Sequence, residues 1–303
     1  MFSPFLQEPL KGDSLTVASE AVKGTEGTGG LFTELFEHAH DSHELDLPFI
    51  GHVQLPHFEP VNIGGMMLDL SITKHVVFVW LAALIVIVLT FVAGRKNAKS
   101  MFPKGMGNLI EMFIVFIRDE ITIPNMGKAG LPYLPYLLTT FFFILTMNLL
   151  GLIPFGATPT GNVNVTAGLA IIAFIMIQIS AIRAQGFGHY IAHLTGGVHW
   201  LLWPIMIPIE IIGLFTKPFA LCVRLFANMT AGHLVIISLI GMIFFFQSYY
   251  IAPVPALFAV GINMLELFVA FLQAYIFTML TSLFMGFGIK AAHAHDGDEN
   301  HDH

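Results

Sequence analysis

The chain has 303 residues, of which 55% are hydrophobic and 11% charged, and its formal net charge is −7. This composition indicates a polytopic membrane protein and excludes a soluble globular domain. The acidic balance gives no support to a nucleic-acid partner, and the single cysteine, Cys222, excludes an intrachain disulfide.

Residues 1–70 predict an extramembrane N-terminal segment with little hydrophobic core, because they are mixed and polar. The stretch EHAHDSHELD places three histidines close together: His38, His40 and His43. A solvated acidic segment accounts for them as well as a metal site does. We therefore predict neither a bound metal nor a cofactor.

A membrane domain is predicted at residues 71–290, and its first span runs from His75 to Gly94. This stretch has about the 20 apolar residues that a helix needs to cross the hydrocarbon core. Cations follow immediately, at Arg95, Lys96, Lys99 and Lys104. They predict that this end faces the cytoplasm and that the N-terminus lies outside.

The middle of the chain predicts one amphipathic helix and two further spans. Gly107–Thr122 is polar on one face and apolar on the other, which suits a helix on the membrane surface or one packed against the protein. Leu131–Ile153 and Thr166–Ile182 are the second and third spans. Arg183 then closes the hairpin on the cytoplasmic side.

The last two apolar blocks, Pro204–Gln247 and Pro255–Lys290, are longer than a simple span requires. As helices they would be roughly 65 and 54 Å long, against a hydrocarbon core of about 30 Å. They predict a long, steeply tilted hairpin, with a kink at Pro218. The fold class is therefore an all-α polytopic membrane protein with about five transmembrane helices, and residues 291–303 form a His/Asp-rich cytoplasmic tail.

Arg224 is the most informative residue, because it lies in the middle of an apolar span. An arginine at the bilayer centre costs about 2.5 to 3.5 kcal/mol on translocon scales. Between Gln185 and Gly288 the only carboxylates are Glu210 and Glu266. The sequence thus restricts the possible counter-ions within this hairpin to two.

If the hairpin turns near residues 248–253, Arg224 lies at the depth of Gln273, and His233 at the depth of Glu266. Neither Glu210 nor Glu266 then stands beside the arginine. Partial pairing with Glu266 through a bent side chain is one explanation. A carboxylate on another chain is the one we favour.

His233 and Glu266 form a predicted titratable couple at membrane depth, which is able to pass protons. A buried hydrogen bond between two helices is the alternative interpretation. Glu210, Lys217 and Arg224 recur every seven residues and predict a charged stripe along one side of their helix.

Residues 75–290 resemble subunit a of the F-type ATP synthase membrane sector. The resemblance depends on four motifs: MNLLGLIP at 147–154, GNVNVTAGLA at 161–170, LFTKPFALCVRLFANMTAGHL at 214–234 and LELFVAFLQAYIFTMLT at 265–281. The combination of RLFANMxAGH with LQAYIF is highly specific. The long N-terminal segment and the tail have no counterpart in this pattern.

The resemblance implies a role for each motif residue in proton translocation. Arg224 is the stator charge that faces a rotating c-ring, with Asn228 and Gln273 from the same motifs beside it. The acid and histidine of the inlet fall on Glu266 and His233. The exit-side glutamate falls on Glu210, and the lysine of the KP motif falls on Lys217.

The implied function is that of a proton-translocating stator subunit in a bacterial inner membrane, with two offset half-channels. Its implied partners are the c-ring carboxylates, the peripheral-stalk b subunits, the rest of the complex and membrane lipid. No GxxxxGK[ST] loop is present, so no enzymatic activity of its own is expected. A stand-alone proton-coupled transporter and a structural anchor without an ion path are the alternatives, although no internal repeat supports a transporter.

Overall fold

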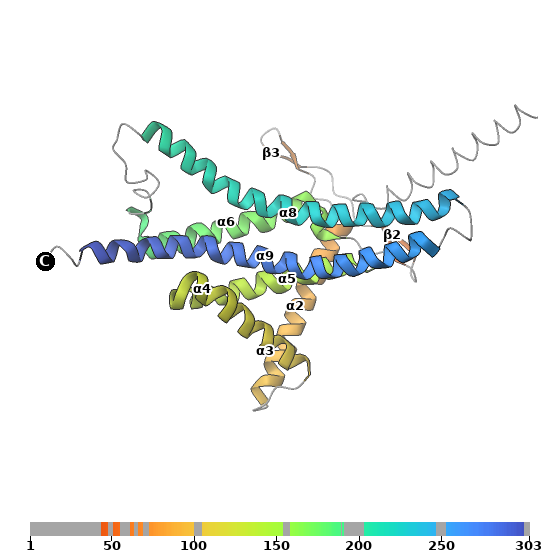
Figure 1. Cartoon of the computed structure of the whole chain (residues 1–303), viewed down its shortest axis with the longest axis horizontal. Coiled ribbons are helices and arrows are strands. Elements are labelled where there is room, and N and C mark those ends of the chain that lie inside the picture. The colour runs from red at the N-terminus through yellow and green to blue at the C-terminus, as the bar shows by residue number, and fades with distance from the viewer. Residues whose placement is uncertain are drawn as a thin grey trace, which may run out of the picture. The chain divides into compact units, whose positions relative to one another are not determined.

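The computed structural model describes residues 44–47, 51–54, 61–63, 66–68, 73–99, 105–153, 158–188, 190, 203–246 and 253–299 (Figure 1). By their contacts they form two compact units. The larger unit comprises the described residues of Asp41–Gly232 and Asn263–His303, and the smaller one those of Met1–His40 and His233–Ile262. The predicted histidine cluster and the hairpin turn at 248–252 lie outside the described residues.

Two short antiparallel hairpins precede the membrane helices. The first pairs β1 (Glu44–Leu47) with β2 (Gly51–Gln54), and the second pairs β3 (Val61–Ile63) with β4 (Met66–Leu68). Two-stranded hairpins have little stability of their own. The N-terminal segment at residues 1–70 stays a prediction.

Five helical stretches among the described residues are long and apolar enough to cross a membrane, as predicted. They are α2 (Lys74–Lys99), the run from α3 to α5, α6 (Val163–Gln185), α8 (Trp203–Phe246) and α9 (Pro253–Glu299). α8 contains Pro208 and Pro218, stays helical across both, and is bent rather than straight (Figure 1). α9 continues nine residues past Lys290, where the predicted span ended.

The second stretch is helical almost throughout but changes its winding. It consists of α3 (Met106–Phe116), the π-helix η1 (Ile117–Thr122), α4 (Ile123–Met126), the 3₁₀ helix η2 (Gly127–Tyr133) and α5 (Leu134–Gly151). In η1 the Thr122 hydroxyl donates to the Ile117 carbonyl at 3.0 Å. The predicted helix at 107–122 is confirmed, while its position on the membrane surface stays a prediction.

An aromatic cluster joins α3, α5 and α9 in the larger unit. Phe113, Phe141 and Phe271 have ring centroids 5.6 to 5.8 Å apart, and Phe142 adds an edge-to-face contact. Ring pairs at these distances stabilise the fold by an amount that adds to the energy gained from burying their apolar area. This cluster packs α9 against α5. The short 3₁₀ helix η3 (Pro159–Gly161) follows α5 in the chain and precedes α6.

Close backbone approaches also fix α9 to its neighbours. The Ser282 hydroxyl donates to the Ile121 carbonyl at 3.2 Å, and Gly286 lies directly against the carbonyl of Asn125. Gly288 similarly approaches Ala181 of α6, where the Gln185 amide donates to the Gly288 carbonyl at 2.7 Å. Small residues at these points allow the helix backbones to meet.

Substitution of Gly286 by alanine is expected to destabilise this packing by about 1 to 3 kcal/mol, because the new methyl group would overlap the Asn125 carbonyl. Gly168→Ala in α6 is the matched control, since no atom lies within 4 Å of the place that its new methyl group would take. There alanine should gain about 0.5 to 1 kcal/mol. Thermal denaturation of the two purified variants in detergent measures both effects. If Gly286→Ala stabilised the protein as much as Gly168→Ala, the close approach of Gly286 to Asn125 would be contradicted.

Candidate functional site

Arg224 lies on the exposed side of α8. A neighbouring side of the same helix carries Leu221, Leu225 and Met229, which are buried at intervals of about one helical turn. They anchor α8 in the larger unit and leave Arg224 exposed. Within the described ranges, the guanidinium has neither an ion pair nor a hydrogen bond.

Large apolar side chains are exposed along α8 on the N-terminal side of Arg224. They recur every three or four residues and end beside the arginine: Ile212 (64% exposed), Phe215 (63%), Phe219 (69%) and Val223 (42%). Arg224 follows Val223 directly and lies about a quarter turn around the helix from this stripe. We call the exposed surface formed by these four residues and Arg224 the arginine face. An apolar face of this kind, with one unpaired cation, is suited to contact with lipid or with another membrane helix that carries an acid.

Asn228 and Gln273 join α8 to α9 one turn away from the arginine. The Asn228 side-chain amide donates to the side-chain oxygen of Gln273 at 2.9 Å, and Gln273 is 2% exposed. The equal depth of Gln273 and Arg224 stays a prediction.

Glu266 is buried without a hydrogen-bond partner among the described residues. Its side chain is 4% exposed, and both carboxylate oxygens lack a donor. It lies directly against Gly232 of α8, where a methyl group would overlap its Oε1 atom. Burying an ionised carboxylate without a partner costs free energy. The surroundings of Glu266 therefore favour a bound proton, a water or a cation.

His233 follows Gly232 directly in the chain and is partly buried. It belongs to the smaller unit, whereas Glu266 belongs to the larger one. Their predicted couple thus remains a prediction. In the larger unit the hydroxyl of Thr230 is also buried and has no hydrogen-bond partner in the described part of the chain.

Lys217 and Glu210 lie earlier on α8. The Lys217 ammonium sits 5.2 Å from the centre of the Phe284 ring of α9, a distance suited to a cation–π contact. Burial, together with the negative charge of Glu210, raises the pKa of the Tyr190 phenol. Tyr190 in turn donates to Gln178 of α6. Of the predicted stripe, Lys217 thus contacts α9, and Glu210 lies close enough to Tyr190 to affect its titration.

Two buried polar residues near this site, Asn148 and Thr160, were not predicted from the sequence. The Thr160 hydroxyl donates to the side-chain oxygen of Asn148 at 2.9 Å, and the Asn148 amide donates to the Ala270 carbonyl at 3.1 Å. Both side chains are fully buried. They hold α9 between Glu266 and Gln273. An asparagine within the apolar run MNLLG was the only available signal.

Comparison with known proteins covers the same helices. Residues 76–286 match the ATP synthase A chain family. The chain belongs to this family. The matched region contains all seven residues predicted for proton translocation.

Bacterial relatives extend the match over most of the chain. A protein named ATP synthase subunit a from Chloroherpeton thalassium is 54% identical over 273 residues, which cover 89% of this chain and 80% of the relative. One from Myxococcus xanthus is 53% identical over 247 residues, which cover 80% and 81%. ATP synthase subunit a 2 from Chlorobaculum tepidum is 48% identical over 295 residues, which cover 96% and 82%. With the five apolar helices, these matches support an integral multi-pass membrane protein.

Proposed function

We propose that this chain is the proton-translocating stator subunit of an F-type ATP synthase. The observation that carries the proposal is the arginine face: a permanent cation among exposed apolar side chains, with no counter-ion in the described part of its own chain. A rotating c-ring that presents one mid-membrane carboxylate after another would supply the missing charge. Beside Arg224, each such carboxylate would favour its ionised form and release its proton.

Two offset half-channels follow from this arrangement. Protons would enter from the outer side past His233 and Glu266, travel on the ring as neutral carboxylic acids, and leave to the cytoplasm near Glu210. Arg224 separates the two paths, because a fixed positive charge repels protons that would pass directly between them. The hydrogen bond between the Asn228 and Gln273 side chains joins α8 to α9 one turn from Arg224.

The energy for rotation comes from the membrane potential and the proton gradient. One charge crossing 100 mV gains about 2.3 kcal/mol, so several protons are needed for each ATP. We infer that nucleotide chemistry belongs to other subunits and that peripheral-stalk b subunits hold this chain still. The proposed location is a bacterial inner membrane, with the N-terminus outside and the C-terminus in the cytoplasm.

A stand-alone transporter or an anchor subunit would use the arginine face differently. A transporter would need a substrate path within the chain, and an anchor would gain nothing from a membrane charge that costs about 2.5 to 3.5 kcal/mol. Uptake of a substrate by the purified chain alone in vesicles would favour a transporter. Neutral substitutions without effect on proton transport would favour an anchor.

Site-directed crosslinking in the complete synthase tests the proposed rotor contact. Val223→Cys, made together with Cys222→Ala, carries a benzophenone on the arginine face; Leu84→Cys on α2, 57% exposed, is the matched control. We expect the Val223 position to crosslink to a small chain with one mid-membrane carboxylate, identified by mass spectrometry. Labelling of lipid alone from both positions would overturn the proposed contact.

A further inference from the structure

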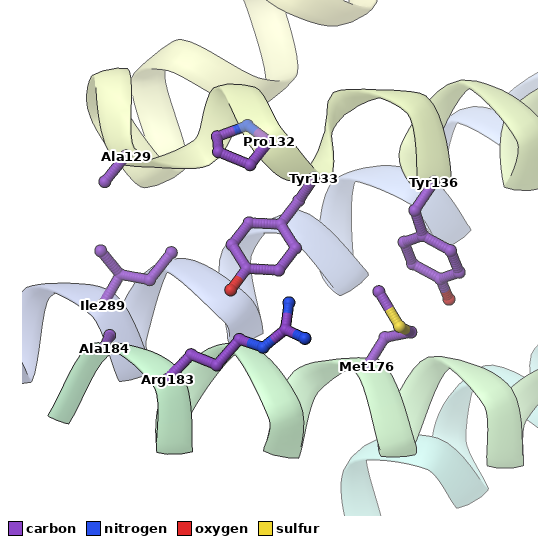
Figure 2. A pocket seen from close by; sticks show the side chains of 8 residues that line it. All are labelled: Ala129, Pro132, Tyr133, Tyr136, Met176, Arg183, Ala184 and Ile289. Carbon is purple, nitrogen blue, oxygen red and sulfur yellow. The ribbon is translucent and has the colours of Figure 1, made fainter. Parts of the chain in front are cut away.

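A cavity of about 480 Å³ lies between three helices, well separated in sequence from the residues proposed to move protons. Its lining comes from η2 and the start of α5, the last three turns of α6, and α9 at Ile289 (Figure 2). Its volume falls in the range of about 300 to 1,000 Å³ that small-molecule sites occupy. The cavity is therefore large enough for a ligand rather than a single water.

The polar part of the cavity carries one positive charge and two phenols. Arg183 extends from the last turn of α6 across the cavity toward Tyr133, and Tyr136 lines the same wall (Figure 2). No Asp or Glu is among the lining residues. Across the described ranges, Arg183 has no ion pair. The Tyr133 hydroxyl lies near the guanidinium, whereas the Tyr136 hydroxyl points away from it (Figure 2). A guanidinium with a hydroxyl group beside it can bind phosphate, the guanidinium through paired N–H donors.

An arginine at a helix C-terminus also stabilises the helix dipole, and this effect alone can place a cation there. It does not require the side chain to turn into a cavity, nor two phenols to line that cavity. The rest of the lining is apolar and includes Pro132, Met176 and Ile289. A free phosphate ion would use only the polar part, whereas an amphipathic ligand would use both.

The position of the cavity along the helices narrows the choice of ligand. Arg183 ends α6 in the same way as Arg95 ends the first span, so both cations mark the predicted cytoplasmic side. Lys290 follows Ile289 on α9 at this same end. The cytoplasmic leaflet contains anionic lipids, and basic pockets between membrane helices bind their headgroups.

We propose that Arg183 and Tyr133 bind the phosphate of an anionic phospholipid, with an acyl chain lying along Met176 and Ile289. This site does not depend on proton translocation by Arg224. It would hold one lipid between α5, α6 and α9 and so join the cytoplasmic ends of these helices.

Photolabelling of the complete synthase in nanodiscs tests the site. The probe is a phosphatidylglycerol with a photoreactive acyl chain, and labelled peptides are mapped by mass spectrometry. In the unmodified complex we expect labelling of the segments around Met176 and Ile289. Arg183→Gln should lower it about tenfold or more, because a charge-assisted contact is lost. Arg95→Gln, which removes an exposed arginine stacked on Phe91, should leave it unchanged.

Three further arms separate the possible sources of phosphate and guard against misfolding. The same probe with a phosphatidylcholine headgroup should label less, and excess inorganic phosphate should not protect the site. The variant Tyr133→Phe should also reduce labelling while its ring still fills the same space. Equal labelling by both lipids, protection by inorganic phosphate, or unchanged labelling in both Arg183→Gln and the tyrosine variant would overturn the proposal.

Discussion

Replacement of Arg224 by alanine is expected to abolish proton-driven ATP synthesis in membrane vesicles. In the proposed mechanism, the arginine favours the ionised form of each passing ring carboxylate, by about 10- to 1,000-fold for an opposite charge at 4 to 6 Å. Without it, the acids stay protonated and the two half-channels are no longer separated. We therefore expect loss of coupled synthesis, with or without a passive proton leak.

Arg224→Lys is expected to fail as well, although it keeps a positive charge. An ammonium on a flexible stem loses its charge more readily when desolvated, and it cannot offer the paired donors of a guanidinium. Arg95→Gln is the matched control, because Arg95 is exposed, stacks on Phe91 and lies outside the site. ATP synthesis at the normal rate in Arg224→Ala vesicles, with the complex assembled, would refute the proposed role.

The order and length of the membrane helices could be predicted from the sequence because hydrophobic length depends on composition alone. The span predicted at Thr166–Ile182 lies within α6, and the block at Pro204–Gln247 differs from α8 by one residue at each end. The change to π-helix in η1 was not predictable. It depends on which carbonyl the Thr122 hydroxyl reaches and on contacts with α9.

The site residues could be named from motifs, but their distances could not. The hydrogen bond between the side chains of Asn228 and Gln273 joins residues 45 positions apart and could not be read from the sequence. The Asn148–Ala270 contact joins residues 122 positions apart and leaves no periodic pattern in the sequence. The close approach of Gly232 to Glu266 is likewise a tertiary contact, since the sequence shows only a glycine within a helix.

Glu266→Gln is expected to slow proton uptake while leaving assembly intact. Glutamine has nearly the shape of glutamate and fills the same buried space, but it cannot give up or accept the transported proton. Removal of a proton-transferring group typically costs on the order of 10² to 10⁴ in rate. Proton flow out of acid-loaded inverted vesicles, whose lumen corresponds to the outer side of the membrane, measures the effect when it is followed with a pH-sensitive dye across a range of lumenal pH.

The burial of Glu266 makes this variant informative about its role. Both carboxylate oxygens lack a hydrogen-bond donor in the described part of the chain, so the charge contributes no ion pair there that glutamine would break. A purely structural glutamate in this position should be replaceable at no cost, since a neutral amide is easier to bury than a carboxylate. Glu111→Gln on α3, whose side chain is exposed, controls for the general loss of one charge. An uptake rate and a pH profile that match those of the unmodified protein would exclude Glu266 from the inlet, whereas a slower rate in an assembled complex would place it on the proton path.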